Sequence, residues 1–138
     1  GIIKPDVVLY EEGLDERTQF VLEAAALTHD IGVKNSERKY GYNNGQTQQE
    51  EGPAPAREML TGLGFDAAVI DRVCYLIAHH HTYTNMDGLD YQILVEADFL
   101  VNLYEMGNTP TEHLRETIFR TAAGRRLLDT MYQPERNL

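Results

Sequence analysis

The sequence has few of the features that mark secreted, membrane-spanning or nucleic-acid-binding proteins. It contains one cysteine in 138 residues, so no disulfide can form within the chain. No apolar run approaches the roughly 20 residues that cross a bilayer, and residues 1–5 are too short in apolar length for a signal peptide. Basic residues number 12 against 22 acidic ones, and the formal charge of −10 argues against broad nucleic-acid or acidic-membrane binding. We therefore expect a cytoplasmic protein that binds neither membrane nor nucleic acid.

The composition that is present suits one globular core. Hydrophobic residues make up 42% of the chain and charged residues 25%, which is typical of an ordered soluble domain. At this length the simplest arrangement is a single domain spanning residues 1–138. Neither an alternating strand pattern nor an internal repeat is visible. We predict an all-α fold.

Helix start and stop signals divide the chain into short helices. The starts are marked by aspartate caps at Asp15, Asp66 and Asp90 or by proline, and glycine marks several of the ends. Polar residues 33–52 show no period and predict a long loop, either a lid or binding loop or a mobile surface segment. The predicted helices cover residues 6–12, 16–29, 53–61, 67–81, 91–106, 110–121 and 125–131.

A histidine and an aspartate stand side by side where the helix over residues 16–29 ends. His29 continues the apolar stripe of Val21 and Ala25, Asp30 follows it, and Gly32 is a natural stop. Burying such a pair is costly unless another group satisfies it, and a divalent cation is one such group. His29 and Asp30 are therefore candidate metal ligands.

A second carboxylate is predicted to point into the core. The helical neighbours of Asp98 include Leu94 and Val101, which are apolar. An ionised aspartate is seldom buried without a partner. The alternative to a metal is a bond to backbone amides or to Asn102, one turn later.

Three consecutive histidines, His79, His80 and His81, end another helix. His80 and His81 prolong apolar seams, whereas His79 falls on the flank. We interpret His80 and His81 as ligands or acid–base groups. A solvated helix end near the negative pole of the helix dipole is the alternative. His113 is interpreted as a surface residue.

Three helices thus direct imidazole or carboxylate groups to one interior. This mixed nitrogen and oxygen set suits one or two ions of Fe, Mn, Ni or Co, or Mg with fewer imidazoles. Such a set can lower the pKa of a bound water and make a nucleophile of it. Lys34, just past the His29-Asp30 corner, is placed to meet an anionic substrate group, while Arg38 and Lys39 are more simply solvated loop charge.

In these residues the chain resembles the HD-domain superfamily of metal-dependent phosphohydrolases. The similarity covers roughly residues 14–105 and keeps the family's order and spacing. The matching segments are residues 24–32 (AAALTHDIG), 77–81 (IAHHH) and 95–100 (VEADFL).

The resemblance implies a compact HD-domain-like helical bundle with a metal site. His29, Asp30 and Asp98 match the ligands of the first metal, and His80 and His81 match positions that add a second ion. The implied activity is attack of a metal-bound hydroxide on a phosphate ester of a nucleotide or other small phosphorylated metabolite. Lys34, His80 and Asp30 take catalytic roles in this prediction, and a homo-oligomer is possible.

The chain departs from the family pattern at two places. No histidine precedes His29, so either the helix that carries the family's first ligand is missing or the site is short by one ligand. Two-metal members often have a histidine where this chain has residues 48–51 (QQEE), and we predict Glu51 as the substitute ligand or base. A di-iron HD-like oxygenase and a degenerate, non-catalytic HD-fold ligand-binding module are the alternative functions.

Overall fold

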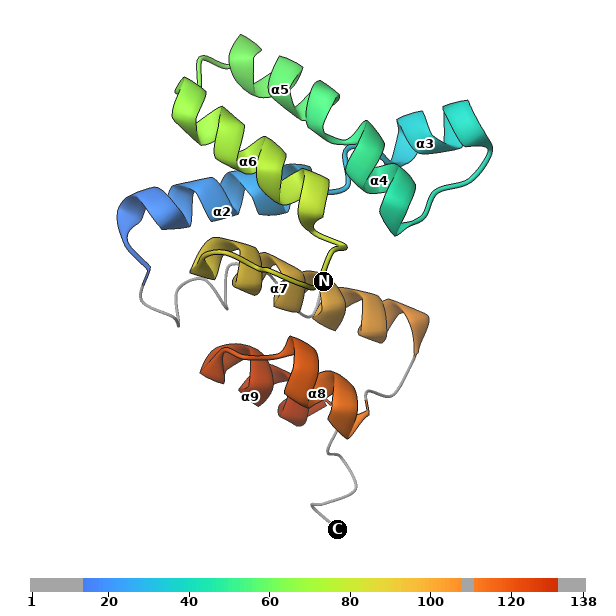
Figure 1. Ribbon diagram of the computed structural model, residues 1–138, viewed down its shortest axis with the longest axis vertical. Coiled ribbons are helices and arrows are strands. Elements are labelled where there is room, and N and C mark those ends of the chain that lie inside the picture. The colour runs from blue at the N-terminus through green and yellow to red at the C-terminus, as the bar shows by residue number, and fades with distance from the viewer. Residues whose placement is uncertain (1–13, 108–110, 132–138) are drawn as a thin grey trace.

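The computed structural model describes residues 14–107 and 111–131, and every regular element in these ranges is an α-helix (Figure 1). The predicted all-α fold is therefore confirmed. The helix predicted over residues 6–12 lies outside the described residues. No described helix has the length and apolar character needed to cross a membrane. The helices are α2 (Glu16–Thr28), α3 (Val33–Tyr40), α4 (Gly45–Glu51), α5 (Pro53–Gly62), α6 (Ala67–His79), α7 (Leu89–Met106), α8 (Glu112–Ile118) and α9 (Ala122–Met131).

The helices stack in successive layers along the long axis of the molecule. In Figure 1, α5 and α6 pair at the top, α2 and α7 lie below them, and α8 and α9 pack against the far side of α7. The core between these layers is built from apolar faces of α2, α6 and α7. Its most deeply buried members include Leu22, Ala25, Val73, Ile77, Ile93 and Leu100.

The prediction of a loop over residues 33–52 is wrong, because two short helices occupy it. Gly41 follows the last residue of α3 and caps it with a left-handed φ of 79°, and α4 begins with a capping box. In that box Thr47 N donates to Asn44 Oδ1 at 3.0 Å, and Asn44 N donates to Thr47 Oγ1 at 2.9 Å. The buried side chain of α3 is Ser36 and that of α4 is Thr47, and both are polar. The sequence of neither helix therefore shows the repeat of apolar residues from which a helix is predicted.

The predicted caps have different outcomes. The side chain of Asp15 accepts a hydrogen bond from Thr18 N at 2.8 Å and caps α2, as expected. Asp66 occupies the N-cap position of α6 without a side-chain cap bond. Asp90 is no cap: it lies inside the first turn of α7, buried, and its two oxygens accept from Arg72 Nε and Nη2 at 2.8 and 2.7 Å. Asp90 Oδ1 also accepts a hydrogen bond from Tyr91 N at 2.8 Å, so the carboxylate combines a local bond with a tertiary ion pair.

A fully buried carboxylate joins α7 to the C-terminal helices. Glu96 accepts hydrogen bonds from the backbone N–H groups of Arg120 and Thr121 at 2.9 and 3.0 Å, and from Thr121 Oγ1 at 2.6 Å. Gln92 Nε2 donates to the same carboxylate at 2.5 Å. These donors satisfy a group that would otherwise be costly to bury, and they fix the entry to α9.

Replacing Gly124 by alanine tests this junction. A Cβ at Gly124 would lie 1.8 Å from Glu96 Oε1 and 2.8 Å from Thr121 Oγ1. Because four hydrogen bonds hold the Glu96 carboxylate, it cannot move aside without breaking them. We expect Gly124→Ala to lower the free energy of unfolding by about 1–3 kcal/mol in urea titrations.

Gly62→Ala is the matched control, since a Cβ there meets no atom within 4 Å. Its stability should be unchanged or raised by up to about 1 kcal/mol, because alanine favours helix over glycine. Equal stability of the Gly124→Ala protein and the parent would contradict the close approach to Glu96.

Candidate metal centre

Three histidines and one aspartate from three helices meet in the structure. His29 follows the end of α2, His80 and His81 follow α6, and Asp98 lies within α7. His29 Nε2 is 3.1 Å from Asp98 Oδ1, and the rings of His29 and His80 stand 5.4 Å apart between centroids. The rings of His80 and His81 are 4.0 Å apart. We call these four residues the imidazole–carboxylate cluster.

Helix ends orient two of the imidazoles. His29 Nδ1 lies 2.8 Å from the carbonyl oxygen of Ala26, and His80 Nδ1 lies 2.6 Å from that of Ile77. Carbonyls in the last turn of a helix lack intrahelical partners and therefore accept such bonds. Because a carbonyl only accepts, Nδ1 carries the proton in each case. In the neutral ring, Nε2 is then the nitrogen with the free lone pair, as in many metal-binding histidines.

The Nε2 atom of His80 is buried and has no hydrogen-bond partner among the described residues. Its side chain is 1% exposed. Burial, together with the neighbouring His81, lowers the pKa of His80 to about 4, so the ring is neutral at pH 7. An unsatisfied buried polar atom costs about 1–3 kcal/mol. A cation beside this nitrogen would remove that cost.

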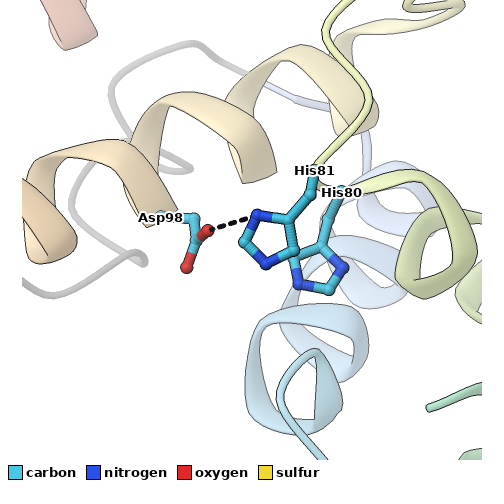
Figure 2. A group of neighbouring side chains, drawn as sticks. All are labelled: His80, His81 and Asp98. Atoms are coloured by element: carbon cyan, nitrogen blue, oxygen red, sulfur yellow. Dashed lines mark ion pairs between the residues drawn. The ribbon is translucent and has the colours of Figure 1, made fainter. Parts of the chain in front are cut away.

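His80, His81 and Asp98 together form a group that could hold a metal ion. One ligand atom from each lies within 4.8 Å of the others. Figure 2 shows Asp98 facing the two rings, and its dashed line marks the 3.9 Å contact between His81 Nδ1 and Asp98 Oδ2. Burial lowers the pKa of His81, which favours its neutral, ligating form. Two imidazoles and a carboxylate are the mixed donor set that the sequence predicted.

Asp98 and His29 form an ion pair at the edge of this group. Burial raises the pKa of Asp98, but the hydrogen bond from His29 and the nearby imidazoles outweigh it and lower that pKa. Burial lowers the pKa of His29, and its bond to Asp98 reverses this to a net increase. Asn102 Nδ2 also donates to Asp98, at 3.3 Å. The alternative predicted for Asp98, a bond to Asn102, thus coexists with its place in the cluster.

Other predicted site residues lie outside the group. Asp30 and Lys34 are exposed, the first beside His29 and the second in the first turn of α3. Glu51, the predicted substitute ligand, points toward α3: its carboxylate pairs with Lys39 Nζ at 3.2 Å and lies 3.4 Å from Tyr40 Oη. Its backbone, rather than its carboxylate, approaches the corner after His29.

The flanking histidines lie where the sequence predicted. His79 stacks on Tyr75 with 4.2 Å between ring centroids, and His113 is exposed on α8. The proposed stand-ins for the family's first ligand, Asp6, Glu11 and Glu12, lie outside the described residues.

Gln48 and Tyr83 are cluster neighbours that sequence reasoning did not select. His81 Nε2 donates to Gln48 Oε1 at 2.9 Å, and Gln48 Nε2 in turn donates to Asn43 Oδ1 at 2.9 Å. Tyr83 Oη lies 3.3 Å from His81 Nδ1. Gln48 lies within residues 48–51, where the sequence predicted a ligand. The predicted ligand there was Glu51, and Gln48 was not chosen.

Comparisons with known proteins give no further assignment. A scan of family models, a search of curated proteins and a search of solved structures each returned no match to this chain.

The buried neutral state of His80 predicts a loss of stability in acid. Its pKa is about 4 in the folded protein against 6.5 for the ordinary group. Between these values the unfolded chain binds a proton that the folded protein excludes, so the free energy of unfolding falls as pH falls from 6.5 toward 4. The full loss is on the order of 3 kcal/mol. Urea titrations of chelator-treated protein between pH 7 and 4.5 measure it, and His80→Asn should show a shallower dependence.

His29→Gln is the opposing control. The raised pKa of His29 gives stability that is present below pH 6.5 and lost as pH rises through its folded value, so removing it should make the acid loss steeper. Identical pH dependence in the parent and His80→Asn would refute this assignment.

Proposed function

We propose that this protein is a metal-dependent phosphohydrolase that acts on a nucleotide or other small phosphorylated metabolite. The observation that carries the proposal is the buried, unpartnered Nε2 of His80 beside His81 and Asp98. These are donor types that bind transition metals, and they occupy the positions that the HD-domain resemblance assigns to ligands.

The protonation states support cation binding. His80 and His81 are neutral at pH 7 because burial lowers the pKa of each, and Asp98 is ionised. A divalent cation held by these three residues would supply a water of lowered pKa and a Lewis acid for the phosphate. His29 already contacts Asp98 and would either join the ligands or orient that carboxylate.

Two exposed residues that follow His29 in the chain take the remaining roles in this proposal. Lys34 would neutralise charge on the phosphoryl group, and Asp30 would accept a proton or complete the ligand set as the resemblance implies. In a chain of net charge −10 such a local cation is needed, because the overall field repels a phosphate ester.

One observation favours the rival function of a non-catalytic ligand-binding module. Gln48 satisfies His81 Nε2, and His29 with Asn102 satisfies Asp98, so much of the cluster is paired without a cation. His80 Nε2 is the exception. A di-iron oxygenase would use the same ligands and differ by an iron pair with a redox signal.

Metal content tests the site directly. Protein purified without added metal or chelator should carry about one or two equivalents of transition metal by elemental analysis. Asp98→Asn and His80→Asn should each lose it, since a missing ligand typically lowers affinity by at least tenfold. His113→Gln, which changes an exposed histidine on α8, should retain the metal. Parent protein that stays empty after metal is supplied would reject the hydrolase and favour the binding module.

Activity tests the role of Lys34. In the metal-loaded protein, Lys34→Ala should lower kcat for p-nitrophenyl phosphate by about 10²-fold, because removing one electrostatic contact to the transition state has effects of this size. Metal content should be unchanged. Arg57→Ala, in α5, provides a control that removes an exposed cation paired with Asp71. Equal kcat in Lys34→Ala and the parent would exclude Lys34 from the site.

A further inference from the structure

A pocket of about 440 Å³ lies next to the imidazole–carboxylate cluster. This volume falls within the range of small-molecule sites. Tyr83 lines the pocket and contacts the cluster, because its Oη lies 3.3 Å from His81 Nδ1. Its ring packs on Phe99 at 4.9 Å between centroids. The side chain of Tyr83 therefore connects the pocket to the cluster. Its lining residues are Tyr83, Thr84, Asn85, Met86, Gln92 and Arg120.

The lining suits a ligand that makes several hydrogen bonds. It offers a hydroxyl, a phenol, two carboxamides and one guanidinium, with no carboxylate among the six residues. Met86 and the ring of Tyr83 add apolar contact. Burial and the charge of Asp98 raise the pKa of Tyr83, so its phenol is neutral at pH 7. The chain as a whole is acidic, so a lining without carboxylates stands out from the rest of the protein.

Gln92 presents a fixed hydrogen-bond acceptor to this pocket. Its side chain is 8% exposed, and its Nε2 donates to Glu96 Oε2 at 2.5 Å and to the carbonyl oxygen of Ile118 at 2.8 Å. A flipped amide would set Oε1 against these two acceptors, so the orientation is determined. Oε1 accepts no hydrogen bond from the described residues and remains available to a ligand hydroxyl.

Asn85 and Arg120 supply the complementary donors. Asn85 has a φ of 55°, a left-handed conformation that asparagine adopts more readily than most residues, and this places it in the turn at the pocket rim. The backbone N–H of Arg120 is anchored to Glu96 at 2.9 Å, so the base of its exposed side chain is fixed. Acceptors and donors thus face one space from two distant segments of the chain.

We propose that this pocket is the subsite for the leaving group of the substrate, and that it binds a polyhydroxylated sugar, free or as part of a nucleoside. The position of the phosphate at the cluster rests on the proposed function. The sugar hydroxyls donate to Gln92 Oε1 and accept from Arg120 and Asn85. The substrate is then a sugar phosphate ester rather than an alkyl phosphate.

Titration of metal-free protein with ribose, adenosine and uridine, followed by ¹H–¹⁵N NMR, tests the subsite without any phosphate. At millimolar ligand we expect shifts at the backbone amides of residues 83–86, Gln92 and Arg120. Arg120→Ala and Asn85→Gly should each raise Kd by about tenfold, through loss of a hydrogen bond to the ligand. Glycine keeps the left-handed turn at position 85. Arg57→Ala, on α5 at the top of Figure 1, changes a residue outside the pocket lining and should leave Kd within twofold.

Three results would overturn the subsite. These are the absence of shifts with all three ligands, shifts that Arg120→Ala and Asn85→Gly leave unchanged, and binding of the nucleosides with no response to ribose. Loss of the proposed hydrolase activity is a separate result, because the titration needs neither metal nor phosphate. An active phosphatase with equal kcat/KM for ribose 5-phosphate and p-nitrophenyl phosphate would also overturn the subsite while leaving the hydrolase intact.

Discussion

A close crossing of two backbone segments holds the cluster together. A Cβ at Gly32 would lie 2.6 Å from Gly52 N, and a Cβ at Gly52 would lie 2.6 Å from Ile77 Cγ2. The corner after His29, the junction of α4 with α5, and α6 are therefore in direct contact, with no room for a side chain between them. This contact brings the end of α2, the polar face of α4 and the end of α6 within side-chain reach of Asp98 on α7. The donor atoms of the cluster depend on that approach.

The inward direction of the cluster residues could be predicted from sequence because periodicity reports orientation. His29, His80 and Asp98 each continue an apolar stripe, and a residue that continues such a stripe faces the same interior. The structure bears this out for each of them: His80 is 1% exposed, and the side chains of His29 and Asp98 are 21% and 11% exposed. The inward direction of a side chain does not by itself show which other side chain it contacts, however. The bond between His29 and Asp98 joins residues 69 positions apart and follows from helix packing.

The sequence could not predict which side chains of α4 reach the cluster, and the reason is physical. Its seven residues are polar, and Thr47 is its one buried side chain, so no period shows which face turns inward. Gln48 and Glu51 are three residues apart and share one side of the helix, yet Gln48 reaches His81 while Glu51 pairs with Lys39. The capping box at Asn44 and the crossing at Gly52 set the rotation of α4. Both are tertiary or terminal features that composition does not encode. Asp90 differs from expectation in the same way, because its pairing with Arg72 spans 18 positions.

Helix α7 links the cluster to the neighbouring pocket through residues on its different faces. Gln92 and Glu96 are one turn apart and point to the α8–α9 junction, whereas Asp98, two residues beyond Glu96, points to the cluster. Asp98 lies six positions after Gln92, a rise of about 9 Å along the helix axis. Because the hydrogen bonds of Glu96 fix the rotation of α7 against α9, the acceptor in the pocket and the carboxylate in the cluster hold a constant spacing. Under the proposed function, a substrate that contacts both groups would have to fit this fixed arrangement.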